Sequence, residues 1–305
     1  MNTVEQNEPL RGQLVVNPVL AEYTTWRVGG LARAMYKPAD FLDLGFFLKQ
    51  LAPEEPVIWL GLGSNSLIHD AGYLGTVILT QGCLNGLTLL DDRTIRVEAG
   101  VSCAKMARFC ARNALSGAEF WAGIPGTMGG ALRMNAGCFD AETWQSVIAV
   151  ETMTRDGVIR HRSPSEFEIA YRHVSGLNKD EWFIAATCRF SPGNKDTALQ
   201  RIKTLLAHRA ATQPTSEYNC GSVFRNPVNH YAAQLIESCG LKGTRLGGAM
   251  VSNKHANFII NDHGSARARD IADLIELVQQ RVYAQHGVEL VREIHFIGDE
   301  HVEVN

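Results

Sequence analysis

The sequence predicts an α+β protein with more than one domain. Its 305 residues correspond to two or three domains of ordinary size, or to one large one. Runs with the two-residue alternation of β-strands recur along the chain, for example at residues 147–153. Helical periodicity is strongest near the end, where residues 266–286 carry an apolar stripe. The apolar fraction of 45% is ordinary for a globular protein with a sizeable core.

The charge balance gives no reason to expect a polyanionic partner. The formal net charge is −3 and no basic run is clustered, so neither nucleic acid nor a membrane surface is predicted. The first eleven residues are polar, unlike a secretory signal. No apolar run approaches the ~20 residues of a membrane helix. We therefore expect a soluble, cytoplasmic protein. A monomer is expected as well.

The cysteines indicate neither a disulfide framework nor a metal centre. There are seven, an odd number, and no Cys-x-x-Cys pair occurs among them. Free thiols in a reducing compartment are the expected state, and no metal ligand set is predicted. Cys220 is interpreted as a bystander, although it lies two residues before Ser222.

The first part of the chain is predicted to contain short strands and one helix. Residues 1–20 form a polar lead. Residues 23–30 alternate polar and apolar side chains and end in a glycine pair, which predicts a short strand and a turn. A second strand is expected at residues 35–38. A helix is expected at residues 40–51, with Asp40 as its N-cap.

A glycine-rich loop follows a buried-type strand at residues 56–60. Residues 61–66 read Gly-Leu-Gly-Ser-Asn-Ser and resemble part of a dinucleotide fingerprint. Ser66 stands where the third glycine would be, and the chain continues to a strand at residues 76–80 rather than to a helix. A Rossmann site requires strand, glycine loop and helix together, so that fold is rejected. Backbone N–H groups of such a loop can still form a nest for a phosphate.

A second glycine-rich segment, residues 123–137, holds five glycines in fifteen residues. Apolar anchors within it favour a ligand-binding loop over a plain linker. Small side chains would let a large flat or phosphorylated ligand approach the backbone closely. Around this segment the sequence predicts a hairpin (87–90 and 94–99), a helix (103–115), strands (146–155, 158–161 and 182–190) and a short helix with a capping box (163–166).

The last part of the chain begins after a break at residues 191–194. A helix over residues 197–211 leads into it, and a domain boundary is expected near residues 205–212. The elements predicted beyond it are a helix (230–239), a strand (256–260), a helix closed by Gly287 (266–286) and a strand (288–297).

The segment Gly221–Pro227 presents a hydroxyl, a guanidinium and an amide between a glycine and a proline. Glycine lets the backbone approach a ligand, and proline ends helix or inner strand. Alone, the segment is more often a turn than an active site. Read with the other motifs, it becomes a candidate site.

These motifs, in this order, resemble the UDP-N-acetylenolpyruvoylglucosamine reductases, the MurB flavoenzymes of bacterial cell-wall synthesis. The motifs that carry the resemblance are Thr-Thr-Trp-Arg-Val-Gly-Gly (24–30), Gly-Leu-Gly-Ser-Asn (61–65), Gly-Ile-Pro-Gly-Thr-Met-Gly-Gly (123–130), Met-Asn-Ala-Gly (134–137), Tyr-Arg (171–172), Gly-Ser-Val-Phe-Arg-Asn-Pro (221–227) and Lys-His-Ala-Asn-Phe-Ile (254–259). Each is weak alone, but the ordered set is specific and covers residues 24–296.

The resemblance implies a two-lobed FAD-binding domain of the vanillyl-alcohol-oxidase (PCMH) type, followed by a C-terminal α+β substrate-binding domain. We expect a lead at residues 1–20, lobe 1 at 21–80, lobe 2 at 81–205 and the substrate-binding domain at 206–305. FAD is the implied cofactor and NADPH the implied reductant. The sequence has no motif that separates NADPH from NADH.

The resemblance also implies roles for individual residues. Ser222 would be the proton donor, with Arg172 and Glu293 as catalytic partners. Substrate contacts are expected from Tyr171, Arg225, Asn226 and His255. The two glycine loops would contact FAD through Gly61, Gly63, Ser64, Asn65, Ser66, Gly100, Pro125, Gly126, Thr127, Gly129, Gly130, Asn135 and Gly137.

The sequence departs from the family pattern at several positions. Trp26 stands where phenylalanine is more usual, and Arg225 where lysine is common, which keeps a cation but changes its geometry. Asp140 replaces a small residue. The short interval between Tyr171 and Ser222 resembles the compact branch of the family, which has no extra substrate-covering loop.

The implied reaction reduces an enol ether next to a carboxylate, and it explains the residue types. Arg172 can grip the carboxylate on which negative charge builds. Glu293 can donate a hydrogen bond if burial keeps it protonated. Ser222 would protonate the second carbon. Two alternatives remain: an FAD-linked oxidase or dehydrogenase acting on an alcohol, and a flavin-free nucleotide-sugar-binding module.

Overall fold

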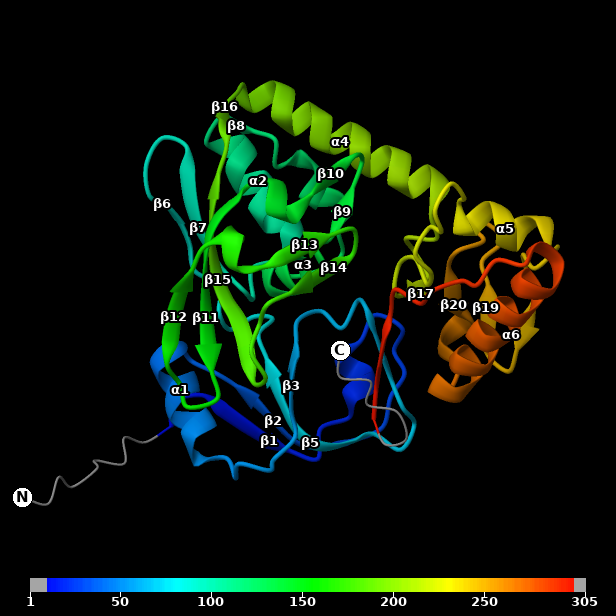
Figure 1. The fold of residues 1–305 in the computed structure, drawn as a ribbon, viewed down its shortest axis with the longest axis horizontal. Helices are drawn as coiled ribbons and strands as arrows, with labels where there is room; N and C mark the ends of the chain where they lie inside the picture. The colour runs from blue at the N-terminus through cyan, green and yellow to red at the C-terminus, as the bar shows by residue number, and fades with distance from the viewer. Residues whose placement is uncertain (1–9, 299–305) are drawn as a thin grey trace, which may run out of the picture.

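The computed structural model describes residues 10–298, which form three larger sheets and four two-stranded ones, joined by helices and loops (Figure 1). The first sheet has the strand order β1-β2-β5-β3. Strands β2 and β3 lie parallel to β5, and β1 is antiparallel to β2. Its strands are β1 (Gln13–Val16), β2 (Ala32–Lys37), β3 (Val57–Leu60) and β5 (Tyr73–Leu79).

Helix α1 (Phe41–Gln50) packs on this first sheet. Its N-cap is Asp40, whose carboxylate accepts a 3.0 Å hydrogen bond from the backbone N–H of Asp43. Leu44 and Phe47 of the helix are buried against Tyr36 of β2 and Ile184 of the second sheet. Helix α1 therefore contributes to the apolar cluster that joins the two sheets.

The second sheet is antiparallel, in the order β12-β11-β15-β7-β6. Helices α2 (Cys103–Arg112) and α3 (Met128–Met134) contribute apolar residues to its largest core cluster. Its strands are β6 (Leu87–Leu89), β7 (Thr94–Glu98), β11 (Val147–Thr154), β12 (Ile159–Arg162) and β15 (Glu181–Arg189). Short two-stranded pairs surround it: β8 (Leu115–Ser116) with β16 (Ser191–Pro192), β9 (Gly137–Cys138) with β10 (Ala141–Glu142), and β13 (Glu168–Ala170) with β14 (His173–Ser175).

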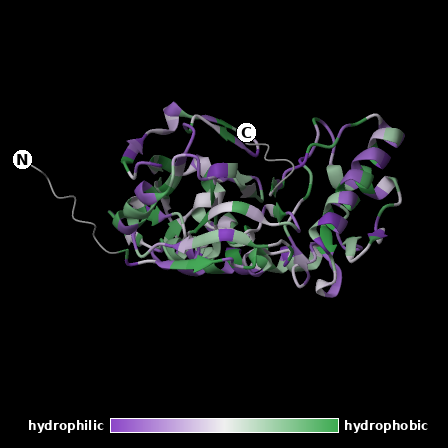
Figure 2. Cartoon of the chain, turned by 90° about the horizontal axis from the view of Figure 1, so that it is seen from below, coloured by the Kyte–Doolittle hydropathy of each residue, from purple (hydrophilic) through white to green (hydrophobic). Residues whose placement is uncertain are grey.

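Helix α4 (Lys195–Thr212) runs from the second sheet to the C-terminal group of elements, along the upper edge of Figure 1. That group holds a four-stranded sheet, β17-β20-β19-β18, and two helices. Its elements are β17 (Tyr218–Asn219), α5 (Ala232–Ser238), β18 (Arg245–Leu246), β19 (Ala249–Val251), β20 (Ile259–Asn261) and α6 (Ala268–His286). Hydrophobic and hydrophilic residues are interleaved along these elements, as expected when each buries one face (Figure 2).

The apolar stripe predicted for α6 is confirmed. Ile271, Leu274, Ile275, Val278 and Val282 are at most 1% exposed. Gly287 ends the helix in the left-handed conformation, with φ of 65°, as predicted.

The end of the described chain returns to the N-terminal part of the fold. Strand β21 (His295–Ile297) pairs in parallel with β4 (Ser66–Ile68), directly after the first glycine loop. Two further contacts join the N-terminal part to the C-terminal group. The Trp26 indole N–H donates to the carbonyl of Ile259 at 2.8 Å. The Asp70 carboxylate accepts the first backbone N–H groups of α6, those of Ala268 and Arg269.

Several sequence-based predictions of secondary structure are wrong. Residues 23–30 form no strand: a 3₁₀ turn (Leu20–Tyr23) precedes irregular backbone, because Trp26 is withdrawn into the C-terminal core. Residues 123–137 are not only loop, since they contain α3. The strand predicted at residues 288–297 is limited to β21, because residues 291–293 pair instead with the irregular segment around Phe224.

The remaining 3₁₀ turns are short: Glu119–Gly123, Thr143–Gln145, Pro164–Glu166 and Asp262–Gly264. The turn at Pro164–Glu166 has the predicted capping box. The strand predicted at residues 256–260 is displaced to β20. Within residues 10–298, every helix is too short or too polar to cross a membrane.

Candidate active site

Arg172 and Glu293 form an ion pair between two distant parts of the chain. Arg172 Nε donates to Glu293 Oε1 at 2.9 Å, and a terminal nitrogen of the same guanidinium donates to the carbonyl of Gly137 at 2.7 Å. Arg172 lies in the two-residue turn between β13 and β14, with a left-handed φ of 54°. Strained backbone of this kind is kept where the surrounding structure requires it, and it often marks functional sites.

Glu293 lies on an extended segment that is held on both sides. Its backbone N–H donates to the carbonyl of Val223 at 2.8 Å. Its carbonyl accepts a 3.0 Å hydrogen bond from the side chain of Asn65, in the first glycine loop. The side chain is 16% exposed, and burial raises its pKa against the lowering effect of Arg172 and Arg225. Glu293 is therefore more readily protonated than an ordinary glutamate.

Ser222 lies on the segment paired with Glu293. Gly221 precedes it with a φ of 77°, and Val223 and Phe224 after it are fully buried. The Ser222 side chain is half-buried, and within the described chain its hydroxyl has no hydrogen-bond partner. The structure thus brings the Ser222 backbone beside Glu293 and leaves the Ser222 hydroxyl available to a ligand.

The four predicted substrate residues divide into two groups. Arg225 Nε is buried without a hydrogen-bond partner within residues 10–298, and its charge acts on Glu293. Tyr171 is exposed and its ring lies 5.0 Å from the Arg172 guanidinium carbon. Asn226, in contrast, uses its side-chain carbonyl to accept the backbone N–H of Ala232 at the start of α5.

His255 also contacts its own neighbourhood rather than the ion pair. Its ring packs edge-on against Phe258, with centroids 4.7 Å apart, and its Nδ1 accepts a 3.3 Å hydrogen bond from the backbone of Asn257. Desolvation, with a smaller effect of Lys242, lowers the pKa of His255. A neutral imidazole is therefore expected here at neutral pH.

The two glycine-rich segments meet face to face. A Cβ on Gly61 would lie 2.3 Å from Thr127 Oγ1, and one on Gly126 would lie 3.6 Å from Ser64 Oγ. In the described chain, the backbone N–H groups of Leu62, Gly63, Ser64 and Asn65 have no acceptor, and neither do those of Thr127 and Gly130. Convergent unpaired N–H groups of this kind fit a phosphate. The arrangement suits the pyrophosphate of a cofactor such as FAD.

Several glycines predicted to contact the cofactor are required by packing. A Cβ on Gly100 would approach the carbonyl of Thr80 to 2.0 Å, and one on Gly137 that of Ala141 to 2.3 Å. One on Gly129 would press against Ala99. Gly63 has a φ of 59° and little space beside Tyr23. Gly130 and exposed Pro125 border open space instead.

Two polar residues predicted to bind the cofactor use their side chains within the protein. The Asn135 amide donates to Glu142 Oε2 and to the carbonyl of Ala170, and its oxygen accepts the N–H of Trp144. Asn65 contacts Glu293, as described above. Ser66 begins β4 and pairs with His295. Any cofactor contact of Asn65 or Asn135 would therefore involve mainly the backbone.

Sequence reasoning missed three residues at this site. His295 lies beside the first glycine loop: its backbone N–H donates to the carbonyl of Asn65, and its Nε2 lies 3.0 Å from Met134 Sδ. Arg133 of α3 is close enough to act electrostatically on His295. Asn257 binds the Ser222 segment. Its signal in the sequence is an asparagine inside the apolar run Ala-Asn-Phe-Ile-Ile, which indicates a satisfied buried amide.

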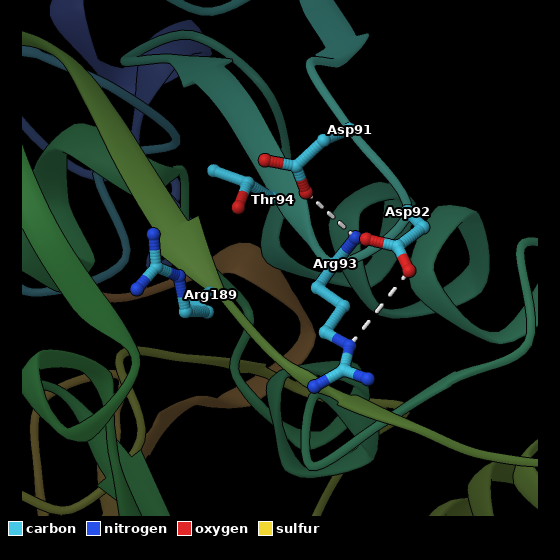
Figure 3. A pocket seen from close by; sticks show the side chains of 5 residues that line it. All are labelled: Asp91, Asp92, Arg93, Thr94 and Arg189. Atoms are coloured by element: carbon cyan, nitrogen blue, oxygen red, sulfur yellow. Dashed lines mark hydrogen bonds and ion pairs between the residues drawn. The ribbon is translucent and has the colours of Figure 1, made fainter.

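Two surface hollows lie away from these residues. One, of about 440 Å³, is lined by Asp91, Asp92, Arg93, Thr94 and Arg189 (Figure 3). The carboxylate of Asp91 accepts the backbone N–H of Arg93 there, so this hollow includes an internally bonded hairpin turn. The other, of about 270 Å³, lies along α2 and is lined by Lys105, Arg108, Phe109 and Arg112. Neither contains a residue of the predicted site.

Two protein-family models match parts of the chain. A protein-family model described as "FAD binding domain" matches residues 43–163. One described as "UDP-N-acetylenolpyruvoylglucosamine reductase, C-terminal domain" matches residues 213–297.

Among curated proteins, the chain is similar to UDP-N-acetylenolpyruvoylglucosamine reductases from several bacteria. It is 68% identical to that of Legionella pneumophila (strain Corby) over 293 residues, covering 96% of this chain and 95% of the relative. For Alkalilimnicola ehrlichii the identity is 52% over 280 residues, covering 92% and 93%. For Coxiella burnetii (strain Dugway 5J108-111) it is 51% over 308 residues, covering 95% and 97%. The crystal structure of the Thermus caldophilus reductase matches with a TM-score of 0.78 and 32% identity, covering 94% of this chain and 99% of that one.

Proposed function

Because the chain belongs to the UDP-N-acetylenolpyruvoylglucosamine reductase family, we propose that it is the FAD-dependent enzyme that reduces the enolpyruvyl ether of UDP-N-acetylglucosamine-enolpyruvate to UDP-N-acetylmuramate. The reaction belongs to peptidoglycan precursor synthesis. NADPH is the proposed reductant. Net addition of one hydride and one proton converts the carbon–carbon double bond to a single bond.

The observation that carries this proposal is the Arg172–Glu293 pair beside the Ser222 segment. An alcohol oxidase of the same fold would need the glycine loops but not a cation, a protonated carboxyl and a hydroxyl together. A binding module would not need an FAD-binding domain. The three side chains supply what reduction of an enol ether next to a carboxylate requires.

Arg172 stabilises the substrate carboxylate as negative charge develops on it. Two of its five N–H donors are engaged, one by Glu293 and one by Gly137. The other three are sufficient for a bidentate contact with a carboxylate. The fixed partners hold the guanidinium in place, so little reorganisation accompanies the chemical step.

Glu293 supports the same carboxylate in its protonated form. Burial favours that form, and a protonated carboxyl can donate a hydrogen bond to developing negative charge. The Ser222 hydroxyl then protonates the substrate carbon that bears the ether oxygen, and solvent or a neighbouring group later restores its proton. FAD, when bound, supplies the hydride from its N5 to the terminal carbon of the enolpyruvyl group.

The cofactor would be held by the facing glycine loops, where Leu62, Ser64 and Thr127 present unpaired N–H groups. Arg225 is proposed to meet the nucleotide-sugar, since its buried Nε requires a partner. Tyr171, Asn226 and His255 are proposed to contribute at the rim of the same site.

The domain division at residues 20, 80 and 205 is also kept as a proposal, although β21 pairs with the first lobe. A cytoplasmic location and a monomeric state stay predictions.

Anaerobic spectroscopy of the purified protein tests the function directly. NADPH should bleach the flavin absorption, and UDP-N-acetylglucosamine-enolpyruvate should then restore it with formation of UDP-N-acetylmuramate. A yellow protein whose flavin is reduced by NADPH but is not reoxidised by this substrate would overturn the proposal. So would a protein that binds no flavin.

A further inference from the structure

Asn257 bonds to the segment that carries Ser222. It is 4% exposed, and its side-chain oxygen accepts the backbone N–H of Phe224 at 3.0 Å. Its side-chain nitrogen donates to the carbonyl of the same Phe224 at 2.8 Å. Its own backbone carbonyl accepts the N–H of Val223 at 2.9 Å. One asparagine thus makes three hydrogen bonds to two residues.

The other edge of this segment is bound by the extended segment that carries Glu293. The carbonyl of Val223 accepts the N–H of Glu293 at 2.8 Å, and the N–H of Arg225 donates to the carbonyl of Val291 at 2.9 Å. Outside this isolated Phe224–Arg292 bridge the segment belongs to no described strand. The carboxamide of Asn257 therefore takes the place of a second neighbouring strand.

This arrangement matters because two polar groups beside Val223 and Phe224 are not oriented by hydrogen bonds of their own. Within residues 10–298, the Ser222 hydroxyl and Arg225 Nε have no hydrogen-bond partner. The position of the backbone that carries them therefore contributes directly to where these groups lie. That backbone is fixed by Glu293 on one edge and by Asn257 on the other.

We propose that Asn257 is a positioning residue for the protonation step: it holds the Ser222–Arg225 backbone so that the Ser222 hydroxyl faces the substrate double bond. The inference rests on the proposed function and adds a residue to it. Asparagine is required because the site presents one N–H and one carbonyl of the same residue. Aspartate cannot donate to the carbonyl, and alanine can satisfy neither group.

A matched control is available four residues later, at Asn261, the last residue of β20. Asn261 is 1% exposed and also makes two side-chain hydrogen bonds of similar length, to the carbonyl of Trp26 and from the N–H of Ala266. Its loss should cost similar stability because a similar number of buried partners is left unsatisfied. Its side chain has no hydrogen bond to the Ser222 segment or to Glu293 within the described residues. Comparing Asn257→Ala with Asn261→Ala thus separates positioning from stability.

The two half-reactions are measured separately on the FAD-loaded enzyme, together with the melting temperature and the Kd of the substrate for the oxidised enzyme. For Asn257→Ala we expect reoxidation of the flavin by substrate to slow by about 10²-fold, with flavin reduction by NADPH within about threefold of wild type. Asn257→Asp should likewise slow reoxidation while leaving reduction nearly unchanged. For Asn261→Ala we expect a similar decrease in melting temperature, with the rates of flavin reduction and flavin reoxidation both unchanged.

A double-mutant cycle gives a readout that a purely structural role would not move. If Asn257 acts through Ser222, its substitution should have little further effect on reoxidation in the Ser222→Ala background. Full additivity would overturn the proposal, as would equal rate losses for the Asn257 and Asn261 variants. If Asn257→Ala does not fold, Asn257→Asp provides the same comparison. Failure of the wild-type enzyme to be reoxidised by substrate would contradict the proposed function instead.

Discussion

The side chain of Asn65 donates a 3.0 Å hydrogen bond to the carbonyl of Glu293, across 228 positions of the sequence. The backbone carbonyl of Asn65 accepts the N–H of His295, which lies two residues after Glu293. The first glycine loop, proposed to hold the cofactor, is thereby joined to the extended segment that carries Glu293. Because this segment also pairs with the Ser222 segment, one continuous set of hydrogen bonds connects the cofactor loop with the backbone of both Glu293 and the Ser222 segment.

Replacing Arg172 by lysine should affect one half-reaction only. Lysine keeps the charge but cannot hold Glu293, Gly137 and a carboxylate with one planar group. We expect reoxidation of the flavin by substrate to slow by about 10²–10³-fold, while reduction by NADPH stays within about threefold of wild type. Stopped-flow absorbance at the flavin band measures both.

Arg162 provides the control for this substitution. It forms an ion pair with the fully buried side chain of Glu181 at 3.2 Å, in the second sheet. Arg162→Lys should leave both half-reactions unchanged. If Arg172→Lys slowed reduction by NADPH as much as reoxidation, Arg172 would have a general rather than a substrate-directed role.

The raised pKa of Glu293 predicts how stability depends on pH. Because the folded protein binds this proton more tightly than the unfolded chain, the group stabilises the fold fully below pH 4.5, its ordinary value. That contribution is lost as pH rises through the raised pKa. Glutamine at position 293 cannot ionise. The melting temperature of the Glu293→Gln variant should therefore rise relative to that of wild type as the pH increases from 4 toward neutrality.

Thermal unfolding of FAD-free protein at several pH values measures this difference. The exposed Glu289 gives the control, since Glu289→Gln should show no growing difference from wild type. A wild-type protein that gained stability relative to Glu293→Gln with rising pH would indicate that Arg172 dominates over burial.

The turn between β9 and β10 should be stabilised by glycine. Phe139 and Asp140 both have left-handed φ values, 54° and 61°, in a two-residue hairpin loop that favours glycine at its second position. Asp140→Gly should raise the free energy of unfolding by up to about 1 kcal/mol, because the left-handed cost exceeds the entropy of glycine. Chemical denaturation measures this. Asp140→Ala, which keeps a Cβ and loses the polar group, should not stabilise.

The sequence predicted the elements whose pattern is local. The stripe of α6 and the hairpin of β6 and β7 follow from periodicity and turn residues alone. Helix α3 could not be predicted from the local pattern, because the glycines at positions 129 and 130 oppose helix formation. It forms through long-range contacts: the N–H of Met128 donates to the carbonyl of Val101, and Leu132 is buried in the core cluster of the second sheet.

The site shows the same division. The motif order indicated Ser222, Arg172 and Glu293, and the structure brings Arg172 into contact with Glu293. Their supporting asparagines could not be assigned from the sequence, because Asn65 and Asn257 act on backbone groups 228 and 33 positions away. Trp26 was placed in a strand for a similar reason, since its burial depends on Ile259 in another part of the fold.

Gly130 offers a substitution that should stabilise the protein and weaken the cofactor site together. It lies within α3 with ordinary helical backbone, and a Cβ there would meet nothing closer than Thr127 Oγ1 at 3.9 Å. Gly130→Ala should therefore raise the stability of FAD-free protein by about 0.5–1 kcal/mol, from helix propensity alone. The same methyl would occupy the space between the facing glycine loops, so the Kd for FAD should rise by about tenfold or more, which is ~1.4 kcal/mol.

Gly61→Ala is the contrasting variant. Its Cβ would collide with Thr127, so this variant should be less stable and should also bind FAD more weakly. Unchanged FAD affinity in Gly130→Ala, measured by fluorescence titration, would mean that the cofactor does not enter between these loops.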